Sequence, residues 1–313
     1  APMAPGIIYP TESIMRMRSR AVPSGPEPDR EDTMLFLQTL WEGIVNGSIY
    51  AMIAMGIALV WGVMGILSFS QGEFMMLGMF ITFYANTYLG LDPVVCVPIV
   101  GLLMFGFGCI VYRTIIAKAL RGPRLSQRLI TFAVGMVLTY GALMLFGGQY
   151  RTVQSLAFTG SIDLAGLTIS RQKLVPLIIA LVMVAFMYIF LNKTMIGKAI
   201  QATSQDKQAA ELVGIDSETT YMVAFGLSSA LAGIAGCAIT YYFPVYYTAG
   251  AAFLLFGFIA VLLGGVGSTF GALVGGLIMG VTDTFSGVYL NTAYKYLAVC
   301  VIFMLIVTFR PKG

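Results

Sequence analysis

The chain has 313 residues, of which 58% are hydrophobic and only 10% are charged. With a mean hydropathy of +0.87, this composition excludes an ordinary soluble domain, in which roughly a quarter of the residues are charged. Histidine is absent, which excludes histidine-based nucleophile activation, metal ligation and proton shuttling. The net charge of +4 comes without the interleaved aromatic residues or reading motif of a nucleic-acid binder.

Residues 1–33 differ from the rest of the chain. They hold six of the twelve prolines together with charges of both signs, and they lack the apolar centre of roughly 7 to 15 residues that a signal peptide contains. We expect a disordered N-terminal extension over residues 1–33 and a membrane domain over residues 34–313.

Nine apolar runs follow, some of them short for a full crossing, since about 20 apolar residues are needed to cross a hydrocarbon core of about 30 Å. The sequence therefore predicts an all-α, polytopic helical membrane protein with eight or nine transmembrane spans. The runs cover residues 35–62, 74–89, 94–112, 129–147, 174–191, 219–242, 252–263, 271–289 and 294–309.

The first interruption of these runs is polar and lies within GVMGILSFSQGEFMMLG, residues 62–78. A glycine-rich interruption lies within LGGVGSTFGALVGG, residues 263–276, where three glycines and Ser268 are expected to break a helix. Broken backbone at membrane depth is tolerated only where protein or a water-filled cavity surrounds it. Two interpretations stay open for the second break, namely helix packing and a transport site.

The basic residues indicate which ends of the spans face the cytoplasm. Residues 112–128 contain five lysine or arginine residues and no acid, and the chain ends in FRPKG. An excess of basic residues in short loops is typical of the cytoplasmic face. We expect this segment and the C-terminus on the cytoplasmic side, and residues 149–173 on the outer side.

Residues 197–216, GKAIQATSQDKQAAELVGID, form a polar segment between two apolar runs on the predicted cytoplasmic side. Thr203 and Asp206 have the spacing of a capping box, Gly214 is suited to end a helix, and Asp216 with Ser217 is suited to cap the next span. Because so short a helix is marginal in water, it needs a surface to pack on. A partner protein and the chain itself both remain candidates for that surface.

Small residues recur at four-residue intervals in three places, and such strips let helices approach backbone to backbone. We interpret them as packing strips. They are Gly43, Gly47 and Ala51; Ser228, Ala232 and Gly236; and Gly267, Gly271 and Gly275.

The polar segment resembles the cytoplasmic coupling loop of bacterial ABC importer permeases of the branched-chain amino acid (LivH-type) family. The residues that carry this resemblance are Gly197, Ala199, Ala202, Asp206, Ala210, Gly214 and Ile215. Residues 47–78 look like the family's opening spans, residues 260–280 look like its glycine-rich signature, and residues 290–313 are similar to its final helix and tail. The resemblance thus covers about residues 34–313.

Two departures from the family pattern bear on function. The sequence SFSQGE, residues 68–73, stands where many members have N-F-A-H-G-E, so Ser68, Ser70 and Gln71 replace Asn, Ala and His. Gln201 stands where the coupling loop often has Arg. The first change bears on substrate choice or local packing, and the second on the strength of docking.

The resemblance implies a permease subunit of a binding-protein-dependent ABC importer in the bacterial inner membrane, with a coupling loop over residues 192–218. It implies three kinds of protein partner besides the lipid bilayer: a second, homologous permease, two cytoplasmic ATPase subunits and a periplasmic solute-binding protein. The chain has no phosphate-binding loop of the G-x-x-x-x-G-K-[ST] type. We therefore expect no catalytic residue, no cofactor and no metal in this chain, and no nucleic-acid partner.

Ionisable and polar residues near the interruptions are candidates to line a translocation path, since a charge at the centre of a membrane helix costs about 2.5–3.5 kcal/mol. A structural role is an open alternative for Glu73 and Asp283, and Lys295 is a possible partner of Asp283. The candidates are Asn46, Ser48, Ser70, Gln71, Glu73, Gly264, Gly265, Gly267, Ser268 and Asp283.

The substrate stays open at this stage. The family implies branched-chain or other hydrophobic amino acids, and similar permeases carry urea and short amides. An ion-coupled secondary transporter or a channel is a further alternative, although neither needs a coupling helix. An intramembrane serine protease is excluded because its serine–histidine pair cannot form without histidine.

Overall fold

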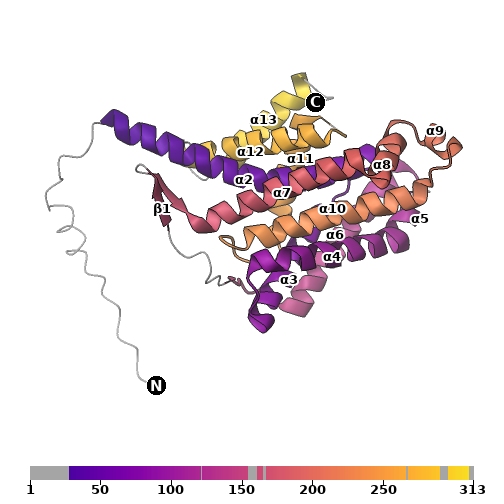
Figure 1. Cartoon of the computed structure of the whole chain (residues 1–313), viewed down its shortest axis with the longest axis horizontal. Coiled ribbons are helices and arrows are strands. Elements are labelled where there is room, and N and C mark those ends of the chain that lie inside the picture. The colour runs from indigo at the N-terminus through magenta and orange to yellow at the C-terminus, as the bar shows by residue number, and fades with distance from the viewer. Residues whose placement is uncertain are drawn as a thin grey trace. The chain divides into compact units, whose positions relative to one another are not determined.

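The computed structural model describes residues 28–120, 122–153, 161–164, 167–265, 267–289 and 295–309. The chain divides into the units 1–36 and 37–313, and the account below concerns the second unit (Figure 1). Each of the nine predicted apolar runs falls on a helix to within a few residues. These helices are α2 (Pro28–Met64), α3 (Gln71–Leu89), α4 (Pro93–Val111), α6 (Arg124–Phe146), α7 (Arg171–Lys193), α10 (Ser217–Ile239), α11 (Ala249–Gly264), α12 (Thr269–Tyr289) and α13 (Lys295–Phe309).

The predicted N-terminal extension overlaps the start of α2, and its residues 1–27 lie outside the described part of the chain. Shorter elements connect the long helices. A π-helical turn, η1 (Tyr112–Ile116), and α5 (Ala117–Ala119) follow α4, whereas α8 (Met195–Gln205) and α9 (Lys207–Leu212) separate α7 from α10. The strands β1 (Ser161–Leu164) and β2 (Leu167–Ser170) form an antiparallel pair that the sequence did not predict.

Six helices among the described residues are long and apolar enough to cross a membrane. They cover Asp32–Met64, Pro93–Ala119, Leu125–Phe146, Arg171–Lys193, Ser217–Ile239 and Thr269–Tyr289, and Ala249–Gly264 is a shorter apolar helix. The prediction of an all-α polytopic membrane protein is confirmed. The number of crossings, eight or nine, stays a prediction.

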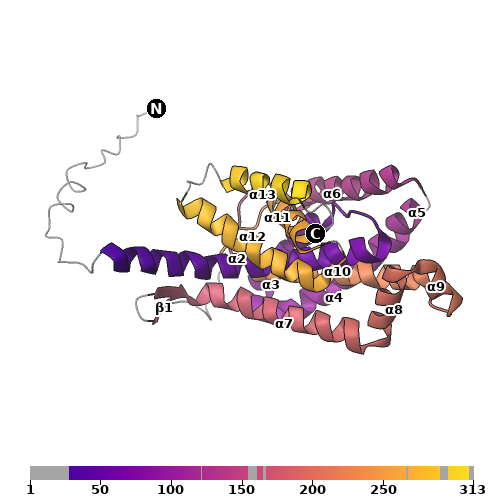
Figure 2. The same cartoon turned by 90° about the horizontal axis from the view of Figure 1, so that it is seen from above.

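Helix α10 lies at the centre of the packing, against α4 and α3 (Figure 2). The most apolar 18-residue stretch of α10 is 89% buried within the chain. Such burial requires close neighbours on several sides of the helix. Small residues make this approach possible: a methyl group on Gly236 would lie 2.1 Å from the carbonyl oxygen of Met75 in α3, and the Ser228 hydroxyl donates a 2.6 Å hydrogen bond to the carbonyl oxygen of Gly56 in α2. The predicted strip on α10 is therefore a packing surface.

Helices α2 and α12 also meet along small residues. A methyl group on Gly43 would lie 2.8 Å from the Val281 Cα, and one on Gly47 would lie 2.9 Å from the Leu277 Cα. These distances leave no room for a side chain. The interpretation of Gly43, Gly47 and Ala51 as a packing strip is confirmed.

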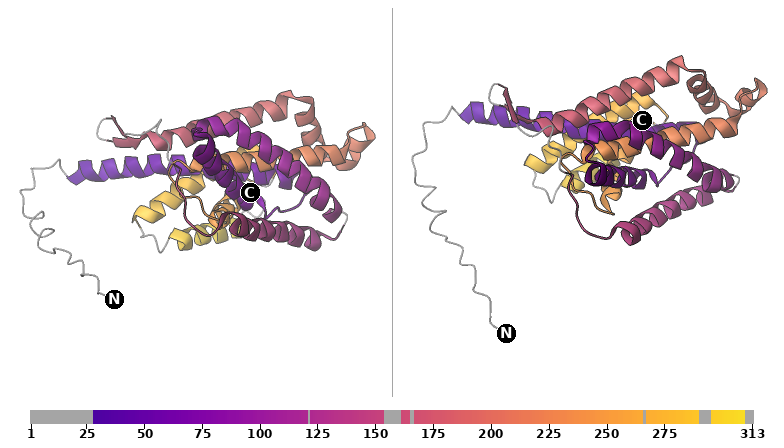
Figure 3. Two further views of the ribbon diagram at one scale, coloured as in Figure 1. Left: turned by 90° about the horizontal axis from the view of Figure 1, so that it is seen from below. Right: turned by 60° about the horizontal axis from the view of Figure 1, so that its bottom comes forward.

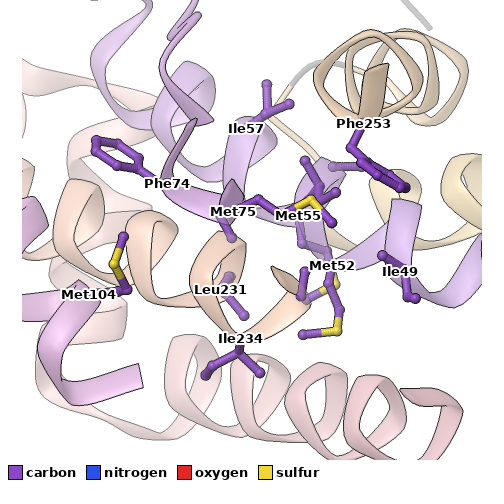
Figure 4. Packing of buried hydrophobic residues seen from close by; sticks show 14 of the residues in the cluster. Ile49, Met52, Met55, Ile57, Phe74, Met75, Met104, Leu231, Ile234 and Phe253 are labelled. Atoms are coloured by element: carbon purple, nitrogen blue, oxygen red, sulfur yellow. The ribbon is translucent and has the colours of Figure 1, made fainter. Parts of the chain in front are cut away.

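The apolar core lies between α2, α3, α10 and α11 and is rich in methionine (Figure 4). Met52, Met55 and Met75 are all at most 2% exposed. Phe74 of α3 packs edge-on against Phe225 of α10, with ring centroids 5.8 Å apart. The flexible methionine side chains fill the irregular space that crossing helices leave between them.

Candidate functional site

The predicted coupling loop folds as two helices, α8 and α9, which project beyond the ends of α7 and α10 (Figure 3). Helix α8 begins after Thr194, whose hydroxyl oxygen accepts a 2.9 Å hydrogen bond from the Gly197 N–H. Gly197 is required at this turn because a methyl group there would lie 2.6 Å from the Leu191 Cα. The sharp turn from α7 into α8 therefore depends on a glycine.

Helix α9 is capped by Asp206, whose carboxylate accepts hydrogen bonds from the N–H groups of Gln208 (2.9 Å) and Ala209 (3.1 Å). Gly214 ends this helical segment with a φ of +87°, and the Ile215 N–H donates to the carbonyl oxygen of Ala210. Glycine is preferred at a left-handed helix end because it has no Cβ to clash. The predicted role of Gly214 is confirmed.

The predicted capping box is wrong. Thr203 lies inside α8, where its hydroxyl donates a 2.8 Å bond to the Ala199 carbonyl oxygen. Asp206 is itself the N-cap residue and not the third residue of the helix. Thr194 caps this helix instead. Because the helix begins after Thr194, Thr203 lies in its interior. Asp216 caps α10 as predicted, accepting a 3.0 Å bond from the Glu218 N–H.

The tip of this segment presents apolar side chains to its surroundings. Leu212 is 88% exposed and Val213 is 78% exposed, whereas Ala210 is buried against the chain. Ala199 and Ala202 are partly buried. Leu212 and Val213 are therefore two adjacent aliphatic side chains that the described chain leaves exposed in a polar connection.

The first interruption separates α2 from α3 at residues 65–70, and Gln71 and Glu73 belong to the first turn of α3. Ser70 and Gln71 are fully buried. The Ser70 and Ser68 hydroxyls are hydrogen-bonded at 3.1 Å, whereas neither amide atom of Gln71 has a hydrogen-bond partner among the described residues. Glu73 faces α6, since a methyl group on Gly135 would lie 3.3 Å from its Oε2.

The second interruption separates α11 from α12, and Gly265 and Gly267 have φ values of +92° and +84°. The Ser268 hydroxyl accepts a 3.0 Å bond from the Gly271 N–H and so caps α12. A methyl group on Gly62 of α2 would lie 2.9 Å from the Gly267 Cα. The predicted break is confirmed, and the second interruption lies against the end of α2.

A third group of path candidates lies between α2 and α12. Asp283 is 1% exposed and accepts a 2.9 Å hydrogen bond from the Tyr50 hydroxyl. Asn46 donates to the Thr284 hydroxyl at 3.3 Å and accepts from the Tyr242 hydroxyl at 3.2 Å. No sequence pattern indicated this tyrosine pairing, because Tyr50 is 233 residues from Asp283.

Ser48 does not join these groups, whereas Gly264 belongs to the second interruption. The Ser48 hydroxyl bonds to the Val45 carbonyl oxygen of its own helix, and Gly264 packs against Gly271 across the α11–α12 turn. The side chain of Lys295, named as a possible partner of Asp283, lies outside the described side chains. The path candidates thus fall into separate clusters, and none of them lines the cavities of about 550, 280 and 550 Å³ in the described residues.

An apolar cavity of about 550 Å³ lies between α7 and α12, beside α2 and α8. Sequence reasoning missed it, because its residues come from four segments of the chain. Met55, Leu181 and Leu273 contribute to its apolar walls, and Gln201 of α8 lines it as well. The coupling segment therefore reaches this apolar cavity through Gln201.

Comparison with known proteins decides the family. A sequence model described as the permease component of the branched-chain amino acid transport system matches residues 39–308. The chain belongs to this family. The permease is 30% identical to LivH from Escherichia coli, a high-affinity branched-chain amino acid transport system permease protein, over 90% of the permease and 96% of LivH.

The permease is more distantly similar to LivM from the same bacterium, a second permease protein of that transport system. The identity is 25%, over 85% of the permease and 67% of LivM. A distant structural similarity links the permease to PsaBC from Streptococcus pneumoniae, with a TM-score of 0.47 and 14% identity over 88% of the permease and 92% of that chain.

Proposed function

We propose that the permease is the transmembrane subunit of a binding-protein-dependent ABC importer that moves branched-chain or other hydrophobic amino acids into the cell. The observation that carries this proposal is the match of residues 39–308 to the family, together with the similarity to LivH along 90% of the chain. The capped α8–α9 segment, with its exposed Leu212 and Val213, supplies a surface on which a motor subunit can act.

In this proposal a second permease completes the pathway, two ATPase subunits bind the α8–α9 side, and a solute-binding protein delivers substrate to the other side. The similarity to both LivH and LivM supports a pair of related permeases. Residues 192–218 are the coupling loop, and Gly197, Ala199, Ala202, Asp206, Ala210, Gly214 and Ile215 form its framework. The C-terminus lies in the cytoplasm.

Nucleotide-driven closure of the ATPases would press on α8 and α9, which are continuous with α7 and α10 through the capped turns at Thr194 and Asp216. Such a push shifts the balance between an outward-open and an inward-open arrangement of the spans. Asn46, Ser48, Ser70, Gln71, Glu73, Gly264, Gly265, Gly267, Ser268 and Asp283 are proposed to line or support the path.

Reconstitution tests this function. The permease is placed in proteoliposomes with its second permease, the ATPase subunits and the solute-binding protein, and uptake of radiolabelled leucine is measured with and without ATP. We expect uptake only with ATP and with every subunit present. Uptake at the full rate by vesicles that lack the ATPase would contradict the proposal, as would ATP-driven transport of urea with no transport of leucine.

A further inference from the structure

The apolar cavity of about 550 Å³ between α7 and α12, which we name the α7 cavity, follows one face of α7. Its lining residues on that helix recur at helical spacing from Leu181 to Asn192. At a rise of 1.5 Å per residue they cover roughly 16 Å of helix. Leu181 lies near the middle of α7 (Arg171–Lys193), and Asn192 lies near its end. The cavity therefore runs from the middle of the helix to the end that joins α8.

The length of the α7 cavity corresponds to the depth of one leaflet of a membrane. The hydrocarbon core of a bilayer is about 30 Å thick, so one leaflet occupies about half of that depth. Helix α7 is one of the helices long and apolar enough to cross a membrane. An acyl chain in the leaflet nearer α8 would therefore extend along the same part of α7 as the cavity does.

The α7 cavity has apolar walls and is open on its outer side. Met55 of α2 lines its inner side and is 2% exposed. Leu181, Tyr188 and Phe270 also line the cavity and are 60%, 65% and 72% exposed. These large side chains lie at the mouth of the cavity. On a membrane-spanning helix, such side chains face lipid unless another protein covers them.

The end of the α7 cavity nearest α8 is polar and is flanked by two cations. Asn192 and Gln201 line this end, and the Gln201 Nε2 donates a 3.3 Å hydrogen bond to the Asn192 Oδ1. Lys193 directly follows Asn192, and Lys198 precedes Gln201 by three residues, a spacing that places two residues on one face of a helix. Both lysines are exposed, and neither makes an ion pair within the described residues.

No acidic residue is among the described residues that line the α7 cavity. The two lysines at its polar end therefore have no local counter-charge in the cavity. Basic pockets between membrane helices bind anionic lipid head groups, because each lysine or arginine near the surface attracts them. An apolar cavity of one leaflet's depth with two cations at its polar end is complementary to a molecule with an apolar tail and an anionic head.

We propose that the α7 cavity binds an anionic membrane phospholipid, with one acyl chain along α7 and the phosphate group near Lys193 and Lys198. This inference goes beyond the proposed function, since it does not depend on which solute the permease moves. Binding also bears on the coupling segment. The cavity is lined by α7 and α8 on the two sides of the turn at Gly197, so a bound lipid would hold α8 in position against α7.

The test counts the lipids retained by the purified full-length permease, alone and together with its second permease. Native mass spectrometry compares phosphatidylglycerol with phosphatidylcholine of the same acyl chains, added in detergent at equal concentrations. We expect phosphatidylglycerol to be retained preferentially. The double variant Lys193→Gln, Lys198→Gln should lower its apparent affinity about fivefold for each lysine removed.

Two matched controls separate the site from general effects of charge and bulk. Arg113→Gln combined with Lys118→Gln also removes two exposed cations, from residues that do not line the α7 cavity, and it should leave the preference unchanged. Ala185→Trp adds a large ring at an exposed position that lines the cavity and should abolish the preference. Val182→Trp adds the same ring at an exposed position of α7 outside the cavity and should preserve it.

Several results would overturn the proposal. These are equal retention of the two lipids by the unmodified permease, an equal loss in the two double variants, and unchanged retention in Ala185→Trp. Release of the lipid when the second permease binds would assign the cavity to the interface between permeases instead. Failure of leucine uptake in proteoliposomes would contradict the proposed function and leave the lipid counts unaffected, so the two failures can be told apart.

Discussion

At the scale of single residues, the most unusual position is Gln71. Its side chain is fully buried at the start of α3, and neither amide atom has a hydrogen-bond partner within the described chain. A buried unsatisfied polar group costs roughly 1–3 kcal/mol. A sequence that retains such a group gives up stability at that point, which is typical of residues that serve transport and not packing.

Replacing Gln71 tests this interpretation. Gln71→Leu should raise the free energy of unfolding in detergent by about 1–3 kcal/mol, because it removes the unsatisfied amide, and should lower the rate of uptake. Ser70→Ala is the control at the same break, and it should lower stability by about 1 kcal/mol because it removes a paired hydroxyl. A Gln71→Leu protein that is less stable and transports normally would show that the amide is structural.

At the residue scale, features that depend on neighbouring residues could be predicted from the sequence, whereas a contact between distant helices could not. Sequence reasoning identified Gly214 as a helix end and Asp216 as a cap correctly, because caps and helix ends depend on neighbours in the chain. It misplaced the helix start at Thr203, since Thr194 satisfies the same local rule earlier. It missed the bond between Tyr50 and Asp283, because only the packing of α2 on α12 brings them together.

At the scale of helices, close contact along glycine strips holds α2 to α12. A methyl group on Gly280 would lie 2.6 Å from the Gly43 carbonyl oxygen, whereas one on Gly141 of α6 would meet nothing within 4 Å. A glycine-to-alanine substitution can therefore be compared at a crowded position, Gly280, and at an open one, Gly141.

Gly280→Ala should destabilise the permease by about 1–3 kcal/mol through overpacking. Gly141→Ala should stabilise it by up to about 1 kcal/mol, since alanine is the better helix former. Thermal unfolding of both variants in the same detergent measures the difference. Equal shifts of the two midpoints would contradict the close α2–α12 contact.

Helix α9 depends on its cap in a comparable way. It has only six residues, and a helix of that length is marginal unless its first N–H groups are bonded. Asp206→Ala removes the acceptor for Gln208 and Ala209 at a cost of about 1 kcal/mol, which should loosen the helix and reduce uptake per ATP hydrolysed. Asp206→Asn keeps a capping side chain and should preserve the ratio.

The measurement is leucine uptake and phosphate release in the same proteoliposomes. Loss of coupling in both variants would mean that the charge of Asp206 acts, and not its cap. An unchanged ratio in Asp206→Ala would count against α9 as the coupling element.

At the scale of the whole molecule, composition and apolar runs were sufficient to predict an all-α membrane protein and the position of each long helix. They were insufficient for the number of crossings, because α11 is short and because length alone does not show whether a helix traverses a bilayer. The cavities that residues 112–120 and 207–222 line together could not be predicted either, since these two segments meet only after folding.

The exposed tip at Leu212 and Val213 also matters before any substrate moves. Until a motor subunit covers it, a newly made copy presents two bare aliphatic side chains to the cytosol in the proposed orientation, and such surfaces attract chaperones and proteases. Copies made in excess of the motor subunit should therefore be short-lived.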